Sequence, residues 1–376
     1  MKSDDINFIL NLINKIGNEI EIDIPLDKEV KFNNIINDYE KSYEMIKKYN
    51  YDELISNEYN DNINNILDNN CNISKFINTN FYEKNLISVF ISTRILRNII
   101  NNLVIKTTYI MKNRKIIIFS KNHIKNNLIN KIDSILNFFN YLSGKNNFYC
   151  IQIYLSDEKK NLNENIDFLG PDNINSGLTL PKYYIILFRK EELIKVLFHE
   201  LVHYLDFDML NNQNELLFLY KDINLKADIV NPNEGYTELL ALVLLNIWEY
   251  NYKNLKIDNF LKIKLNIELY WSFIQITKIL KFFKYKSFSK IFENDNVFNQ
   301  KTNVLSYFFF KTVLLLNINT IFDDLSLNNI FINRKRINII KNTSNLKNLK
   351  SYIDIVYQEY DSNKFDKKNL RMSFFG

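Results

Sequence analysis

The stretch EELIKVLFHELVHYLDFD (residues 191–208) holds two of the three histidines in the 376-residue chain. His199 and His203 are four residues apart in an apolar setting, which predicts a helix carrying both imidazoles on one face. Two imidazole nitrogens on neighbouring turns can reach one ion, so the His-Glu-x-x-His pattern indicates a zinc site. Glu200 follows the first histidine and would lie beside the metal, where a general base could accept a proton from a metal-activated water.

A zinc ion used in catalysis usually takes three protein ligands and leaves one position for water. Downstream of the histidines the chain reads NPNEGYTELLALVLLNIWEY (231–250), and Pro232 indicates the start of a helix. Glu234 and Glu238 fall on one face of that helix, so either carboxylate is a candidate for the third ligand. Asp206 follows His199 by seven residues and is a candidate for an outer contact with the site.

The His-Glu-x-x-His helix followed by Asn-Glu-Gly resembles the gluzincins, the thermolysin-like and aminopeptidase-like zinc metallopeptidases. This resemblance implies Glu234 as the third ligand and Glu238 as the acidic residue that holds a ligand histidine. The 30 residues between His203 and Glu234 exceed the usual gap of that family, so Glu238 stays open as the ligand. The linked patterns NSGLT, FRKEELIKVLFHE and NEGYTE also resemble metallopeptidases predicted in large DNA viruses, over about residues 147–250.

Two further parts of the candidate site are expected from the same chemistry. Asn175, Ser176 and Gly177 precede the predicted zinc helix, where zincins have an edge strand that binds the substrate backbone. A glycine there would let the substrate approach closely. Tyr307 is the candidate donor to the oxyanion, because no histidine follows His203 in the sequence.

The periodicity predicts an α+β fold that is predominantly helical. We expect a zincin-like domain over residues 111–376, with a small twisted sheet and the active-site helix in 111–210 and a helical subdomain in 211–376. Residues 1–110 would be an N-terminal helical region, either separate or packed on the sheet. Helices are expected at 5–17, 33–49, 83–105 and 130–144, a poorly ordered connection at 57–80, and strands at 115–121, 147–156 and 182–190.

Composition narrows the setting of the protein. The net charge of +5 is small and the basic residues are interspersed with acidic ones, so no nucleic-acid partner is predicted. The N-terminus does not read as a secretory signal, and the longest apolar run, LLALVLLNIW (239–248), is about half of a membrane span. Cys71 and Cys150 are too few for a disulfide framework. We therefore expect a soluble protein in a reducing cytoplasm, that of the host if the chain is viral.

The function that these patterns predict is hydrolysis of peptide bonds in a peptide or protein substrate. One Zn²⁺ per chain would bind to His199, His203 and Glu234, with Glu200 as the general base. A zinc-binding interaction module without catalysis is the alternative. A helical interaction protein in which the two histidines are incidental is a further possibility.

Overall fold

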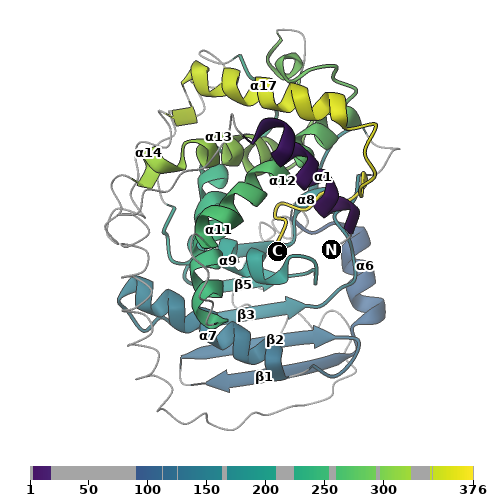
Figure 1. The fold of residues 1–376 in the computed structure, drawn as a ribbon. Helices are drawn as coiled ribbons and strands as arrows, with labels where there is room; N and C mark the ends of the chain where they lie inside the picture. Colours follow the sequence, from purple (N-terminus) through teal and green to yellow (C-terminus); the bar gives the residue numbers. More distant parts are fainter. Residues whose placement is uncertain are drawn as a thin grey trace.

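The structure, a computed structural model, describes residues 3–17, 90–111, 113–124, 126–162, 167–208, 224–253, 260–293, 297–322, 339–340 and 342–375. A five-stranded sheet lies at one end of the molecule, and most of the helices gather at the other end (Figure 1). The described residues therefore form the mixed, predominantly helical α+β fold that the sequence predicts. The helix expected at 33–49 and the connection at 57–80 lie outside the described residues.

The sheet has the strand order β1-β2-β3-β5-β4. Its inner pairs, β2 with β3 and β3 with β5, are parallel, while both outer pairs are antiparallel. The three strands that the sequence predicts are confirmed as β2, β3 and β5. The strands are β1 (Ile105–Met111), β2 (Arg114–Ser120), β3 (Tyr149–Tyr154), β4 (Gly177–Leu180) and β5 (Tyr184–Leu187).

Both faces of the sheet are buried, which explains the unbroken apolar run of β2. Ile116 and Ile118 face the main hydrophobic core. Ile117 and Phe119 point the other way, into a smaller core beneath α6. Alternate side chains of β2 therefore pack into two separate hydrophobic cores, one on each face of the sheet.

The helices bracket the sheet and build the main core. Those of the described residues are α1 (Ser3–Ile16), α6 (Thr93–Asn102), α7 (Asn126–Ser143), α8 (Pro171–Ile174), α9 (Leu193–Tyr204), α11 (Pro232–Tyr252), α12 (Phe260–Phe282), α13 (Lys311–Leu316), α14 (Ile318–Phe322) and α17 (Thr343–Glu359), with a 3-10 turn η1 (Phe288–Phe292) and a π-helical turn η2 (Ser306–Phe310). The helices expected at 5–17 and 130–144 are thus confirmed as α1 and α7. Gly144 ends α7 with a φ of 63°, a conformation that favours glycine.

The helix expected at 83–105 is wrong at its C-terminal end. Helix α6 ends at Asn102, and Ile105 already begins strand β1. Leu103 ends the helix in an extended conformation, and its amide donates to the Ile99 carbonyl. Isoleucines occur on both sides of this boundary, so apolar spacing did not separate the helix from the strand that follows it.

The described N-terminal segments pack into the same body as the rest of the chain. The Phe8 ring of α1 stacks on Phe365 with 4.6 Å between ring centroids. The Asp5 carboxylate accepts a hydrogen bond from the Asp366 amide at 3.2 Å. Strand β1 forms one edge of the sheet. Helix α1 and the sheet are therefore parts of one packed unit.

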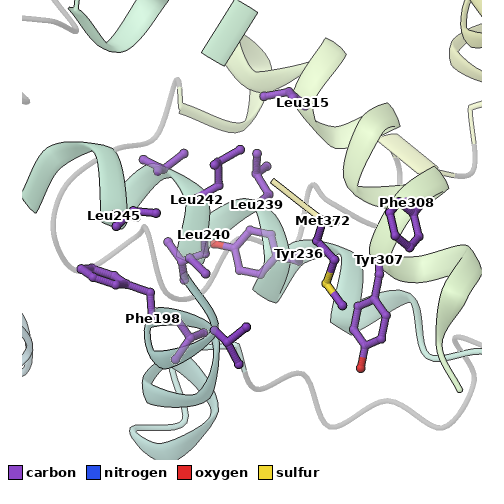
Figure 2. Packing of buried hydrophobic residues seen from close by; sticks show 14 of the residues in the cluster. Phe198, Tyr236, Leu239, Leu240, Leu242, Leu245, Tyr307, Phe308, Leu315 and Met372 are labelled. Carbon is purple, nitrogen blue, oxygen red and sulfur yellow. The ribbon is translucent and has the colours of Figure 1, made fainter. Parts of the chain in front are cut away.

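Helices α9 and α11 pack directly against each other, and this contact positions the candidate site. Phe198 of α9 lies among Leu240 and Leu245 of α11 (Figure 2). Helix α11 begins where the sequence predicts, because Pro232 fixes the first turn and the Asn231 side chain accepts from the Asn233 amide at 3.1 Å. The polar first turn of α11 is thereby brought beside the histidine face of α9.

The last described residues run into the centre of the molecule, where the chain end marked C lies beside α9 (Figure 1). The Leu370 amide donates to the Lys160 carbonyl at 2.6 Å, and the Trp271 indole donates to the Arg371 carbonyl at 3.3 Å. Leu370, Met372 and Phe374 are buried. This segment is thus part of the core.

Two expectations about the setting of the protein meet the structure here. No helix in the described part of the chain has the length and apolar character needed to cross a bilayer. Cys150, buried in β3, is disulfide-bonded. This bond differs from the reducing setting that we expect from the sequence.

Candidate metal centre

Three acceptor atoms from two helices converge on one point. The Nε2 atoms of His199 and His203 are 3.0 Å apart, and Glu234 Oε2 lies 3.4 Å from the first and 3.3 Å from the second. Ligands held about 2.0–2.2 Å from a tetrahedral zinc ion are roughly 3.3–3.5 Å from one another. The donor set and its spacing therefore fit one zinc ion bound by His199, His203 and Glu234.

The opposite nitrogen of each imidazole faces a buried carboxylate. His199 Nδ1 lies 2.8 Å from Glu238 Oε1, and His203 Nδ1 lies 2.7 Å from Asp208 Oδ2. A carboxylate at Nδ1 favours a proton on that nitrogen and leaves the Nε2 lone pair free to bind a metal. Both rings are therefore oriented with their metal-binding nitrogens toward Glu234.

The charges of the site depend on one another. Burial lowers the pKa of His199, but Glu238 and Glu234 outweigh it and raise that pKa above its usual value. Burial also lowers the pKa of His203, but Glu234 and Asp208 outweigh it and raise that pKa well above its usual value. Burial raises the pKa of Glu234, yet the two histidines hold it below its usual value. In the metal-free chain, the carboxylates therefore favour the protonated form of both imidazoles.

Glu200 points from α9 toward strand β4. Its Oε2 accepts a hydrogen bond of 2.7 Å from the Thr179 hydroxyl, which also donates to the Glu200 carbonyl at 3.1 Å. Burial, the largest influence, raises the pKa of Glu200 above its usual value despite the neighbouring histidines. A carboxylate with a raised pKa is better suited to accept and return a proton near neutral pH.

Gly177 makes room for Glu200. A Cβ atom at position 177 would lie 2.6 Å from Glu200 Oε1 and 2.9 Å from its Cγ. The sequence predicts that this glycine admits the substrate backbone. The structure adds a second reason for a glycine here, because α9 packs directly against β4 and leaves no space for a side chain.

A cavity of about 200 Å³ opens over the metal-binding group. Its polar wall combines the histidines with Glu200, and its other walls are largely apolar. The cavity is lined by Phe90, Asn175, Ser176, Gly177, Leu178, Thr179, Pro181, Val196, His199, Glu200, His203, Glu234, Glu238, Tyr307 and Met372. All three residues of the expected substrate strand therefore border the candidate site.

Asn175 and Ser176 differ in how their side chains are bound. Asn175 Oδ1 accepts from the Thr302 hydroxyl at 2.8 Å, and its amide donates to the Phe90 carbonyl at 3.3 Å. The Ser176 hydroxyl is buried and has no hydrogen-bond partner among the described residues. Asn175 thus helps to build the wall, whereas Ser176 keeps its hydrogen-bonding capacity.

Tyr307 lies in the wall of the same cavity, as the sequence predicts. Its ring meets His199 edge-on, with centroids 5.9 Å apart, and Figure 2 shows its hydroxyl pointing away from the leucines of α11. Burial, then Glu234 and Glu200, raises the pKa of Tyr307 well above its usual value, so the phenol keeps its proton. Tyr307 belongs to the π-helical turn η2, a feature frequent at functional sites.

The sequence predicts that the Asp206 side chain contacts the site, but its carboxylate points elsewhere. Its backbone amide donates to the His203 carbonyl at 3.1 Å. Helix α9 ends at Tyr204, and Asp206 turns away with a φ of 58° to form an ion pair with Lys182. The helical spacing used in the prediction no longer applies beyond the end of the helix. Asp208 takes the expected role, and it also accepts a hydrogen bond of 2.8 Å from the Thr237 hydroxyl.

Several residues of the site were missed in the sequence. Asp208 is the last residue of the quoted stretch 191–208, and Thr179 is the last residue of NSGLT. An acidic residue just after the histidine helix and a hydroxyl just before it were the signals that could have indicated them. Lys195 precedes His199 by one helical turn but reads as an ordinary surface lysine. Met372 lies more than 160 residues from the motif, so no local pattern connects it with the cavity.

Comparison with known proteins leaves the activity open. No family model matches the chain, and no solved structure does. The chain is 30% identical over 199 residues to "Uncharacterized protein R210" of Acanthamoeba polyphaga mimivirus, a match that covers 49% of this chain and 50% of that protein. That name assigns no activity.

Proposed function

We propose that the chain is a zinc-dependent hydrolase of peptide bonds, of the gluzincin type. The observation that carries this proposal is the convergence of two imidazole nitrogens and one carboxylate oxygen within 3.0–3.4 Å. Glu200 lines the same cavity as these ligands. Glu234 is the third ligand in this proposal, because Glu238 is occupied by His199 Nδ1 and Lys195.

Glu200 acts as the general base and then as the general acid. A bound zinc ion supplies a Lewis acid that polarises the scissile carbonyl and lowers the pKa of water. The Glu200 carboxylate accepts the proton of the attacking water and returns it to the leaving amine. Its hydrogen bond with Thr179 fixes the carboxylate, and the raised pKa suits both steps.

Tyr307 supplies a hydrogen bond to the oxyanion that forms when the carbonyl is attacked. Its phenol stays protonated because burial and the neighbouring carboxylates oppose its ionisation. A preorganised neutral donor in a buried site stabilises a developing negative charge more strongly than water does. This contribution is distinct from that of Glu200, because Tyr307 does not transfer a proton.

The peptide substrate lies along strand β4. This strand is at the edge of the sheet, and Gly177, Leu178 and Thr179 line the cavity. An edge strand offers backbone amides and carbonyls that an extended peptide can pair with. The polypeptide backbone is thereby recognised, while the apolar walls select the side chains.

The test of this proposal is the Glu200→Gln variant, with Glu249→Gln on α11 as a matched control. Both proteins are incubated with a cell lysate, new peptide termini are compared, and zinc content is measured. We expect hydrolysis to fall at least about a hundredfold in Glu200→Gln, since general bases contribute about 10²–10⁴-fold. Zinc content should stay near one ion per chain.

The same experiment separates catalysis from a purely binding role. Glu249 lies near the far end of α11, where it pairs with Lys253 and Lys264, so its variant should cleave like the wild type. Equal cleavage by Glu200→Gln would remove the proposed base. A wild-type chain that binds zinc and yields no new termini would favour the non-catalytic zinc-binding module.

A further inference from the structure

Lys195 is a buried cation directly behind the candidate metal centre. It precedes His199 by four residues on α9, and its side chain is 1% exposed. Its ammonium forms an ion pair with Glu238 Oε2. The other oxygen of that carboxylate, Oε1, is the one that lies 2.8 Å from His199 Nδ1. Glu238 therefore connects Lys195 with a metal ligand.

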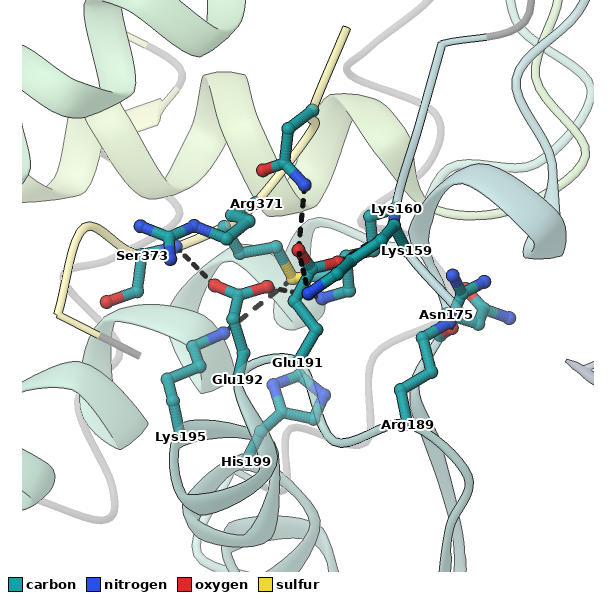
Figure 3. Close-up of polar contacts among 12 residues, drawn as sticks. Lys159, Lys160, Asn175, Arg189, Glu191, Glu192, Lys195, His199, Arg371 and Ser373 are labelled. Carbon is teal, nitrogen blue, oxygen red and sulfur yellow. Dashed lines mark hydrogen bonds and ion pairs between the residues drawn. The ribbon is translucent and has the colours of Figure 1, made fainter. Parts of the chain in front are cut away.

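The C-terminal segment (residues 369–375) closes off Lys195 from water. Met372 Sδ lies 3.7 Å from the Lys195 ammonium, and the Met372 carbonyl accepts a hydrogen bond of 2.7 Å from the Lys311 ammonium. The Ser373 amide donates to Glu192 Oε1 at 2.7 Å, which fixes the segment above α9 (Figure 3). Met372 also lines the cavity, so this segment separates the ammonium from the candidate substrate site.

Lys195 belongs to a lysine–glutamate cluster that is buried throughout. Lys160 pairs with Glu192 at 2.6 Å, with both side chains 0% exposed. The members of this cluster are Lys160, Lys195, Lys311, Glu192, Glu238 and Glu268. Within the described residues, Lys195 is the lysine of this cluster that forms an ion pair with Glu238. The Glu238 carboxylate in turn lies beside the candidate ligand His199.

The pairing with Lys195 restricts how Glu238 can be oriented. A carboxylate held at one oxygen by a fixed ammonium presents its other oxygen in one direction only. In a buried site this constraint is strong, since both the hydrogen bond and the ionic attraction are little screened. Contacts of this outer kind fix the ring orientation and the tautomer of a metal-binding histidine.

We propose that Lys195 is a positioning residue for the metal centre, acting on His199 through Glu238 and kept in place by the C-terminal segment. This inference rests on the zinc site of the proposed function. It adds a residue and a segment outside the His-Glu-x-x-His and Asn-Glu-Gly patterns. Because Lys195 does not face the reacting atoms, its loss should weaken zinc binding first.

The test compares Lys195→Met with Lys160→Met. Both substitutions remove a buried ammonium from an ion pair with a glutamate, so both should lower the free energy of unfolding in denaturant. Zinc affinity is measured by competition with a chromophoric chelator. We expect Lys195→Met to bind zinc about 10–100-fold more weakly than the wild type, the range for outer contacts of metal ligands. Lys160→Met should bind zinc like the wild type.

A second comparison covers the case in which Lys195→Met does not fold. Glu238→Gln leaves the buried Lys195 ammonium without its partner carboxylate, whereas the double variant Lys195→Met/Glu238→Gln leaves no unpaired buried charge at this pair. If Lys195 acts through Glu238, the double variant binds zinc no more weakly than Glu238→Gln. A further tenfold weakening in the double variant would overturn the proposed route.

The wild-type measurement separates this inference from the proposed function. Tight zinc binding by the wild type with equal affinity in Lys195→Met overturns the positioning role and leaves the zinc site standing. An equal loss of affinity in Lys160→Met also overturns it, because the effect would then be general destabilisation. A wild-type chain that binds no zinc overturns both proposals.

Discussion

Two buried polar clusters meet at Glu238, and they are built in opposite ways. In the lysine–glutamate cluster, carboxylates face donors: Glu192 binds the Lys160 ammonium at 2.6 Å and the Ser373 amide at 2.7 Å. In the metal-binding group, His199, His203 and Glu234 point acceptor atoms at one another. The first cluster is complete with protein groups alone, whereas the second requires a cation or added protons.

The difference separates structural from functional polar residues. A buried ion pair that is satisfied by its neighbours can be explained by folding alone. The three groups of the candidate metal centre instead need a proton or a metal cation between them, because two nitrogen lone pairs and a carboxylate oxygen that face one another repel. Substitutions in the two clusters should therefore affect different quantities, stability in one and metal affinity in the other.

The largest effect is expected for His203→Ala. Zinc binding in protein sites is worth roughly 10–16 kcal/mol over about four ligands, so losing one ligand should weaken it about 10²–10³-fold. The measurement is zinc affinity by chelator competition. His123→Ala is the matched control, because this exposed histidine lies outside the cavity lining. Unchanged affinity in His203→Ala would exclude it as a ligand.

Glu192→Gln should affect stability instead. The glutamine still accepts from the Ser373 amide, but Lys160 loses its buried counter-charge. We expect a loss of about 3 kcal/mol in the free energy of unfolding, as for other broken buried pairs, with zinc affinity nearly unchanged. Glu293→Gln, which removes an exposed pair with Lys290, should change stability by no more than about 0.5 kcal/mol.

The pH dependence of the Glu192 contribution has a definite sign. Burial raises the pKa of Glu192, but Lys160 and Lys195 bring it below its usual value. The stabilisation is therefore present above the pKa of an unfolded glutamate and is lost as the pH falls through the folded pKa. The difference between wild type and Glu192→Gln should accordingly shrink in acid, and a constant difference would contradict the ion pair.

A smaller effect is expected from pH on zinc binding. The raised pKa values of His199 and His203 mean that zinc must displace protons from the metal-free site. Affinity should rise with pH, by about tenfold per unit for each proton released. These protonated histidines stabilise the metal-free chain below their unfolded pKa, and that contribution is lost as the pH rises through the folded pKa.

Calorimetry in buffers of different ionisation enthalpy measures the released protons. Release of one to two protons per zinc at pH 6.5 is the expected result. Zinc binding without proton release would contradict the raised pKa values of His199 and His203 in the metal-free chain. Metal-free stability that increases between pH 6 and 8 would contradict the same assignment.

Much of the candidate site was accessible from local sequence. The spacing of His199 and His203 determined a shared helical face, and Asn-Glu-Gly at the start of a helix indicated Glu234. Tyr307 was selected for its hydroxyl alone and borders the cavity. Asp206 was wrong because the prediction extended helical spacing past the end of α9.

The sequence by itself determined which residues can bind a metal, since ligand chemistry and helical spacing are local properties. Only the tertiary structure decided three contacts of the site. Asp208 lies beside His203, Glu200 packs against Gly177, and Met372 covers Lys195. These pairings join segments that are brought together by packing of the core. Side-chain spacing along one helix or strand contains no information about which distant segment will cover it.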